Sequence, residues 1–221
     1  MAGRLQDRVA MVVGAGSSGP GWGNGKATAV LFAREGAKLF CVDINPAAAE
    51  ETAEIIRGEG GEAEAFRADV AKAAEVEAMV ARCVEIFGRI DVLDNNVGIV
   101  EVGGPVETSE EGWDRVIDVN LKSMFLTCKH VLPVMERQGG GVIVNIASIA
   151  GIRDTGVPYI SYSTSKGAVI PFTRSIALQY AKMGIRANAI LPGLMNTPMI
   201  VEPLEGASAE GAVDEMIRKR D

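Results

Sequence analysis

The chain has 221 residues, of which 48% are hydrophobic and 23% are charged, and this predicts one globular domain rather than a disordered chain. The net charge of −7 argues against a nucleic-acid partner, because binding to backbone phosphates needs a concentrated field of Lys and Arg, and it disfavours anionic membranes too. The one excess in composition is glycine, with 26 residues, roughly 12% of the chain against a typical ~7%.

Neither a membrane span nor a secretion signal is predicted. No apolar run approaches the ~18 residues that cross a bilayer, and the first residues lack an apolar signal core, so we expect a cytoplasmic protein with no membrane partner. Cys41, Cys83 and Cys128 are widely spaced in apolar segments, which predicts buried thiols rather than disulfides or a metal site. We expect the single histidine, His130, to be a structural or surface residue of a helix.

Short apolar runs alternate with longer segments of helical period along most of the chain. The predicted strands span residues 9–13, 38–42, 63–67, 91–95, 142–147 and 185–191. The predicted helices span residues 26–35, 46–57, 73–87, 120–137 and 162–182, with a loop between residues 95 and 120. This alternation indicates an α/β fold built on a single Rossmann-type, doubly wound parallel sheet over residues 1–221.

The last segment differs from the rest. Residues 202–221 are mostly charged, with an apolar stripe of Val213, Met216 and Ile217 only, and they end on Arg and Lys residues that suit a helix C-terminus. We expect a surface helix there.

A glycine-rich loop at residues 14–25 lies between the first predicted strand and the first predicted helix. In that position, backbone amides can approach a pyrophosphate at a positive helix N-terminus, so the loop favours dinucleotide binding over a merely flexible turn. Asp43 ends the second strand, where its carboxylate can accept hydrogen bonds from the adenosine ribose and repel a 2′-phosphate. This favours NAD(H) over NADP(H), the alternative being an ordinary strand-end cap.

Four polar side chains are expected to converge at one edge of the sheet. Tyr162 and Lys166 are spaced i, i+4 on a predicted helix, Ser148 follows the fifth strand, and Asn120 begins the long helix. The Tyr and Lys spacing alone is common in structural pairs. The addition of Ser148 and Asn120 makes a catalytic group the better interpretation.

With these motifs the sequence closely resembles the classical short-chain dehydrogenase/reductase family over residues 5–199. The matching pieces are the glycine loop, Asp69-Val70, Asn95-Asn96-Val97-Gly98, Asn120, Ser148, Tyr162 with Lys166, Pro192-Gly193 and Thr197-Pro198. Val97 replaces the family's commoner alanine, a change that we expect to be neutral.

The resemblance implies a role for each matching residue. Tyr162 would be the acid/base, Lys166 would hold the nicotinamide ribose and depress the tyrosine pKa, Ser148 would position the substrate oxygen, and Asn120 would hold a relay water. The full set of expected cofactor-binding residues is Gly14, Ser17, Gly23, Asn24, Gly25, Asp43, Asp69, Val70, Asn95, Gly98, Tyr162, Lys166, Met195 and Thr197. No metal site is expected.

Elementary physics agrees with tyrosine chemistry. A free tyrosine has a pKa near ~10, so a useful shift of about 2 to 3 units needs roughly 3 to 4 kcal/mol of phenolate stabilisation, which Lys166 and a positive nicotinamide ring can supply. The expected reaction is the reversible conversion of a secondary alcohol to a ketone by hydride transfer.

The glycine loop departs from the family pattern, because eight residues instead of three separate Gly14 from Gly23. We align Gly23 and Gly25 with the last two family glycines, since the helical pattern begins directly after them. A rival alignment uses Gly19 and Gly21. The extra residues would form either a flap beside the pyrophosphate or a surface bulge.

A second departure concerns the C-terminal part, where residues 194–221 would form the substrate loop and lid. The family usually adds a further helix and a seventh strand, neither of which is found, so we expect the sheet to lack its last strand and keep an unpaired edge. A naturally short protein is the less favoured explanation. A truncated chain, or a sequence that records only the ordered part, is favoured over it.

The leading hypothesis is an NAD(H)-dependent dehydrogenase that acts on a neutral secondary alcohol or ketone. We expect this enzyme to form a homodimer or homotetramer through helices 120–137 and 162–182. The alternatives are a dinucleotide-binding sensor or assembly subunit without turnover, and an epimerase or dehydratase. Residues 101–105, 149–159 and 194–216 are the expected walls of the substrate pocket, in which Glu101, Asp154 and Thr155 either bind a polyol or sugar or face water.

Overall fold

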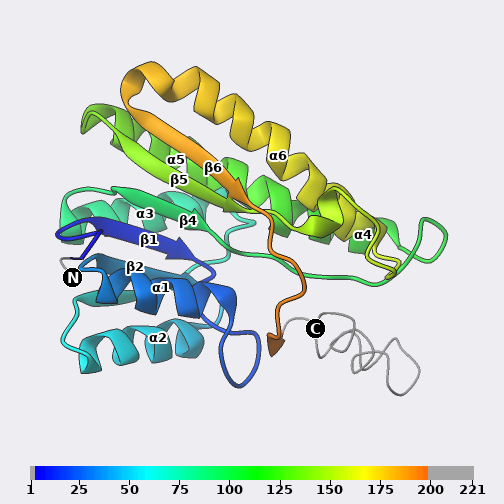
Figure 1. Ribbon diagram of the computed structural model, residues 1–221, viewed down its shortest axis with the longest axis horizontal. Coiled ribbons are helices and arrows are strands. Elements are labelled where there is room, and N and C mark those ends of the chain that lie inside the picture. The colour runs from blue at the N-terminus through cyan, green and yellow to red at the C-terminus, as the bar shows by residue number, and fades with distance from the viewer. Residues whose placement is uncertain (1–2, 199–221) are drawn as a thin grey trace.

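The computed structural model describes residues 3–198 and confirms the α/β fold, with six parallel strands in the order β3-β2-β1-β4-β5-β6 (Figure 1). Every strand lies within one residue of its predicted bounds. The strands are β1 (Val9–Val13), β2 (Lys38–Asp43), β3 (Ala63–Arg67), β4 (Val92–Asn95), β5 (Gly141–Ile146) and β6 (Ile185–Ile190). The chain order reverses between β1 and β4, and such a switch point is where parallel sheets place ligands, beyond the carboxyl ends of the strands.

Helices cover both faces of the sheet. On one face lie α1 (Asn24–Arg34) and α2 (Pro46–Gly58), and on the other lie α3 (Ala73–Phe87), α5 (Ser123–Arg137) and α6 (Ile160–Tyr180). All five residues of β1 are buried, because alternate side chains enter the two cores. A strand buried on both faces reads as a continuous apolar run, which is why the sequence predicted it correctly.

One helix differs from the prediction. The segment α4 (Glu110–Ile117) lies where we expected a loop, and it runs through a π-helical turn (Asp118–Lys122) into α5. Ser109 caps α4, with Oγ accepting from the Gly112 amide at 3.0 Å. The helix is eight residues long and buries only Gly112 and Val116, so it is shorter than the window of about 11 residues over which a helical period is read.

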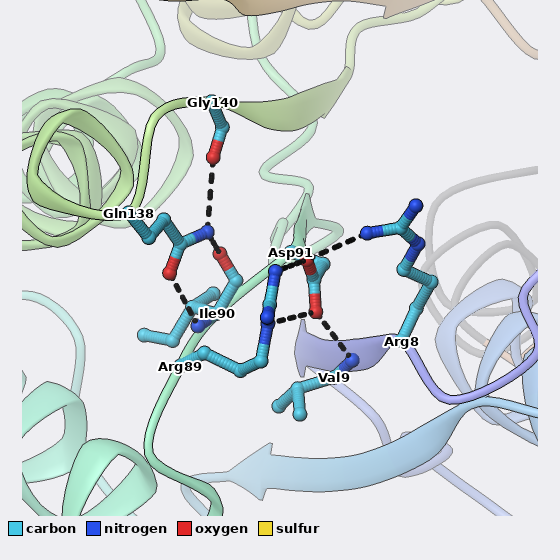
Figure 2. A network of polar contacts seen from close by, with 7 residues as sticks. All are labelled: Arg8, Val9, Arg89, Ile90, Asp91, Gln138 and Gly140. Atoms are coloured by element: carbon cyan, nitrogen blue, oxygen red, sulfur yellow. Dashed lines mark hydrogen bonds and ion pairs between the residues drawn. The ribbon is translucent and has the colours of Figure 1, made fainter.

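The amino end of the sheet is closed by a polar network around Asp91 (Figure 2). Its carboxylate accepts from the Val9 amide at 2.9 Å, from Arg89 Nε and Nη2 at 2.9 and 2.6 Å, and from Arg8 Nη1 at 3.3 Å. Burial by itself raises the pKa of Asp91, but the bonds from Arg89, Val9 and Arg8 outweigh it and hold this pKa below its ordinary value.

Gln138 extends the same network from the end of α5. Its Oε1 accepts from the Ile90 amide at 3.2 Å, and its Nε2 donates to the carbonyls of Ile90 at 2.6 Å and Gly140 at 2.9 Å (Figure 2). The network therefore fixes the starts of β1, β4 and β5 relative to one another.

Other predictions stand as follows. The three cysteines are free and buried, as expected. The described part of the chain contains no helix long and apolar enough to cross a membrane. The surface helix expected at 202–221, most of the lid at 194–221 and the question of a seventh strand lie outside the described residues.

Candidate functional site

A cavity of about 740 Å³ opens at the carboxyl ends of the strands and receives residues from the loops that follow all six of them. Its volume lies within the range of cofactor and drug sites, ~300–1,000 Å³. Most of the predicted cofactor residues line it: Gly14, Ser17, Gly23, Asn24, Gly25, Asp43, Asp69, Val70, Gly98, Tyr162, Lys166, Met195 and Thr197. Ser148 lines it as well.

The glycine loop has the shape of a phosphate cradle. Gly14 adopts a φ of +85°, and a Cβ on Gly25 would lie 1.8 Å from the Gly14 carbonyl oxygen, so a side chain cannot be accommodated there. Helix α1 begins directly after Gly23 without a side-chain cap, which leaves its first amides available to an anion. The Ser17 hydroxyl is buried, lines the cavity and has no partner among the described residues. These features fit the pyrophosphate of a dinucleotide.

The inserted residues of this loop are anchored by Lys26. Its side chain is 5% exposed, and its Nζ donates to Glu51 Oε1 at 2.6 Å and to the Gly21 carbonyl at 3.4 Å, and lies 5.3 Å from the centre of the Trp22 ring. None of residues 19–22 is among the described residues that line the cavity. This placement favours the alignment on Gly23 and a surface bulge over a flap.

Asp43 is held at the end of β2 by two backbone amides. Its Oδ2 accepts from the Gly16 amide at 2.9 Å and its Oδ1 from the Asn45 amide at 3.0 Å. Each carboxylate oxygen has a further lone pair, so Asp43 can still accept hydrogen bonds from a ribose. The site therefore fits the adenosine side of a dinucleotide.

Tyr162 and Lys166 lie one turn apart on α6, and both are on the cavity wall. Burial raises the pKa of the Tyr162 phenol, and hydrogen bonding to Ser148 acts in the opposite direction. The Lys166 Nζ donates to the Ile146 carbonyl at 2.8 Å and lies 5.9 Å from the centre of the Tyr162 ring, and burial lowers the pKa of Lys166 to about 8. In the protein alone, burial thus outweighs the expected depression of the tyrosine pKa.

Asn120 is fully buried in the π-helical turn and is not among the described cavity-lining residues. Its Oδ1 accepts from the Ile99 amide at 2.8 Å, and its Nδ2 donates to the Ile99 carbonyl at 2.9 Å and to Ser165 Oγ at 3.1 Å. Ser165 Oγ in turn donates to the Tyr162 carbonyl at 2.7 Å. Asn120 therefore joins the loop after β4 to the helix that carries Tyr162, and its role in a water relay stays a prediction.

Asn95 does not lie where the resemblance placed it. Its side chain points into the core, where Oδ1 accepts from Thr127 Oγ1 at 2.7 Å and Nδ2 donates to Asn145 Oδ1 at 2.8 Å. Asn96 lines the cavity instead, with Nδ2 donating to the Gly14 carbonyl at 3.4 Å. Asn95 still belongs to β4, so its side chain is directed to one face of the sheet rather than to the cavity beyond the strand end.

Sequence reasoning missed two features of this region. Thr155 was expected only as a possible polyol or sugar contact, and its hydroxyl pair with Tyr159 on the cavity wall was not foreseen. Asp94 in β4 is 1% exposed, its Oδ2 has no partner among the described residues, and burial raises its pKa to about 7. No group of metal-ligating side chains occurs within residues 3–198.

The comparisons with known proteins agree with this geometry. The family model described as short chain dehydrogenase matches residues 8–206. Cyclohexanol dehydrogenase from an Acinetobacter species is 41% identical over 204 residues, 91% of this chain and 78% of that protein.

Solved structures agree as well. A short-chain dehydrogenase/reductase structure from Burkholderia xenovorans has a TM-score of 0.89 and 48% identity, covering 93% of this chain and 81% of that one. The 7 alpha-hydroxysteroid dehydrogenase, solved with NADH and 7-oxo glycochenodeoxycholic acid, has a TM-score of 0.86 and 31% identity, covering 97% and 80%. The chain therefore belongs to the short-chain dehydrogenase/reductase family, as an NAD(P)-dependent oxidoreductase that acts on alcohols and ketones.

Proposed function

We propose that the protein is an NAD(H)-dependent enzyme that interconverts a secondary alcohol and a ketone, with Tyr162 as the acid/base. One observation carries the proposal: the same cavity holds a phosphate cradle, the Asp43 carboxylate, and the pair of Tyr162 and Lys166. The first two account for the cofactor, and the pair accounts for the movement of a proton.

The preference for NAD(H) rests on Asp43. Its carboxylate is oriented by the amides of Gly16 and Asn45, so it can accept from two ribose hydroxyls. A 2′-phosphate at the same place would meet a like charge, which is destabilising. When bound, the nicotinamide supplies the hydride chemistry.

The side chains divide the proton chemistry among them. In the oxidation direction, the carbinol C–H bond breaks with loss of a hydride, the hydroxyl proton passes to the Tyr162 phenolate, and a C=O bond forms. Ser148 is placed to hold the substrate oxygen, since it lines the cavity and acts to lower the pKa of Tyr162 against burial. Lys166 contributes a buried cation that favours the phenolate, against the burial that raises the pKa of Tyr162.

The direct test follows NADH absorbance with purified protein, NAD⁺ or NADP⁺, and secondary alcohols beginning with cyclohexanol, the substrate named for the Acinetobacter relative. We expect turnover with NAD⁺ and at least tenfold lower kcat/KM with NADP⁺. In the variant Asp43→Ala this preference for NAD⁺ falls. Binding of NADH without turnover of any alcohol or ketone would instead favour a sensor, and product formation without net change in NADH would favour an epimerase or dehydratase.

We also propose that the enzyme is a cytoplasmic homo-oligomer. Phe125 on α5 and Leu178 on α6 are 52% and 74% exposed, which suits two helices that pack against a second copy. Sedimentation should give a dimer or tetramer, and Leu178→Lys should shift it towards the monomer. A monomeric wild type would overturn this proposal.

A further inference from the structure

Two hydroxyl side chains form a polar corner of the cavity, next to the proposed acid/base. Tyr159 and Thr155 both line the cavity, and their hydroxyl oxygens are hydrogen-bonded to each other. The rings of Tyr159 and Tyr162 pack edge to face, with centroids 5.3 Å apart and planes at 81°. Tyr159 therefore packs directly against the side chain of Tyr162, which we assign to proton transfer.

The backbone holds this corner in place. Gly103 forms an isolated parallel bridge with Tyr159, in which the Gly103 amide donates to the Pro158 carbonyl at 2.6 Å and the Ile160 amide donates to the Gly103 carbonyl at 3.0 Å. Helix α6 begins at Ile160, directly after Tyr159. The Tyr159 ring is thus placed by a helix start and by the loop after β4, rather than by a free loop.

The pair retains unused hydrogen-bonding capacity. Each hydroxyl has one donor hydrogen and two acceptor lone pairs. The bond between Tyr159 and Thr155 uses one hydrogen and one lone pair, whichever residue donates, so one O–H and several lone pairs remain. Among the described residues, neither hydroxyl makes another hydrogen bond. A substrate hydroxyl or carbonyl oxygen could use this capacity.

The rest of the wall favours a neutral, mainly apolar molecule. Ile99, Val100, Ile149, Val157 and Leu194 line the same cavity as the hydroxyl pair. Arg153 and Asp154 also line it, but their charges are opposite. A hydroxyl pair carries no charge, so it is matched to a neutral oxygen rather than to a carboxylate or phosphate.

We propose that Tyr159 and Thr155 form a subsite for a second oxygen function of the substrate, a hydroxyl or carbonyl on the same small apolar skeleton as the reacting carbinol. This assignment rests on the proposed function, because Tyr162 fixes the position of the first oxygen. It narrows the substrate class to diols, hydroxyketones and diones.

The test measures binding without turnover. Protein saturated with NADH is titrated by calorimetry with cyclohexanol and with the 1,2-, 1,3- and 1,4-cyclohexanediols, which cannot react because cofactor and ligand are both reduced. At least one diol should bind about tenfold more tightly than cyclohexanol, the effect expected of one well-placed additional hydrogen bond.

Variants then locate the effect. Tyr159→Phe keeps the ring, Thr155→Val keeps the shape, and each should reduce the advantage of the diol to within about threefold. Tyr180→Phe makes the same chemical change at the far end of α6, where Tyr180 packs on the core, and it should leave the advantage intact. The absence of a diol advantage in the wild type, or an advantage that survives both cavity variants, would overturn the subsite.

Because the titration needs no catalysis, the two proposals fail separately. Turnover of cyclohexanol with NAD⁺ but no diol advantage overturns only the subsite. A diol advantage that depends on Tyr159 and Thr155, in a protein that oxidises neither compound, supports the subsite and overturns only the proposed reaction.

Discussion

Two aspartates at opposite ends of strand β4 have opposite surroundings. Asp91, just before the strand, is 7% exposed and accepts hydrogen bonds from Val9, Arg8 and Arg89. Asp94, near the strand's carboxyl end, is 1% exposed and has an oxygen without a partner in the described part of the chain. Their pKa values move in opposite directions, down for Asp91 and up to about 7 for Asp94.

This contrast extends to the two ends of the sheet. The described residues contain four buried side-chain atoms without a hydrogen-bond partner, all at the carboxyl side: Ser17 Oγ, Asp94 Oδ2, Thr108 Oγ1 and Ser161 Oγ. The amino end, by comparison, is closed by satisfied bonds (Figure 2). Of the four, Ser17 alone is among the described residues that line the cavity, so its hydroxyl is available to a ligand there, whereas the bonds at the amino end stabilise the fold.

The largest effect should come from the cation at the carboxyl end. Lys166→Met should lower kcat/KM about 10²- to 10⁴-fold, or about 3 to 5 kcal/mol, because the phenolate loses its buried cation. In the wild type, burial lowers the pKa of Lys166 to about 8, so kcat for ketone reduction, which needs the protonated Tyr162 beside the cation, should fall as the pH rises through that value. The matched control is Lys122→Met, which removes an exposed lysine paired with Asp118 and should leave kcat/KM nearly unchanged. An unchanged kcat/KM in Lys166→Met would contradict the role of the cation.

Asp94 should give a pH-dependent stability effect. Its pKa is raised in the folded state above the ordinary ~3.9, so the fold binds the proton more tightly and loses stability as the pH rises from about 4 to 7, by up to about 4 kcal/mol. Asp94→Asn should remove this loss. Urea unfolding at pH 4 and pH 8 measures the free energy of unfolding of the variant and the wild type. If the two proteins differ in this free energy by the same amount at both pH values, the prediction is refuted.

Asp91 should behave in the opposite sense. Its lowered pKa contributes stability that is present above the ordinary ~3.9 and is lost as the pH falls through the folded-state value. Asp91→Asn should cost about 2 to 3 kcal/mol at pH 7, since Arg8 and Arg89 are half exposed and only the Val9 bond is buried. Asp118→Asn, at an exposed pair, should cost about 0.5 kcal/mol or less. An equal loss of free energy of unfolding in Asp91→Asn and Asp118→Asn would mean that the amino-end network stabilises the fold no more than an exposed ion pair does.

The smallest effect should come from the anchor of the glycine loop. Glu51→Gln leaves the buried Lys26 ammonium without its carboxylate, although the Gly21 carbonyl and the Trp22 ring remain. We expect about 1 kcal/mol, seen as roughly fivefold weaker NADH binding, because Glu51 itself is largely exposed. Fluorescence titration measures it, with Glu62→Gln at the exposed Lys38 pair as the control. Equal NADH affinity in Glu51→Gln and wild type would show that the anchor does not support the cofactor loop.

The sequence predicted β1 and β2 well because each is a short apolar run buried on both faces. Helix α4 was missed because its eight residues are too few for a helical period to be recognised. Asn95 was predicted to bind the cofactor, but Asn96 lines the cavity and Asn95 bonds within the core. A motif does not tell which of two adjacent side chains extends beyond the strand end.

Other features depend on contacts between distant segments. The unpaired Asp94 oxygen and the bond between Tyr159 and Thr155 follow from what packs around them, which a single sequence does not show. The direction in which the pKa of Tyr162 shifts also depends on what packs around it. Lys166 lines the same cavity as Tyr162, but the extent of burial at Tyr162 was not foreseen.

The central claim is that the carboxyl-end cavity performs proton transfer through Tyr162. The most direct measurement is kcat of Tyr162→Phe with NAD⁺ and the best alcohol, beside NADH affinity by fluorescence titration. The account predicts a fall in kcat of about 10²- to 10⁴-fold with NADH affinity retained within a few-fold, because only the acid/base is removed. A variant that binds NADH normally and keeps more than a tenth of the wild-type kcat would contradict it.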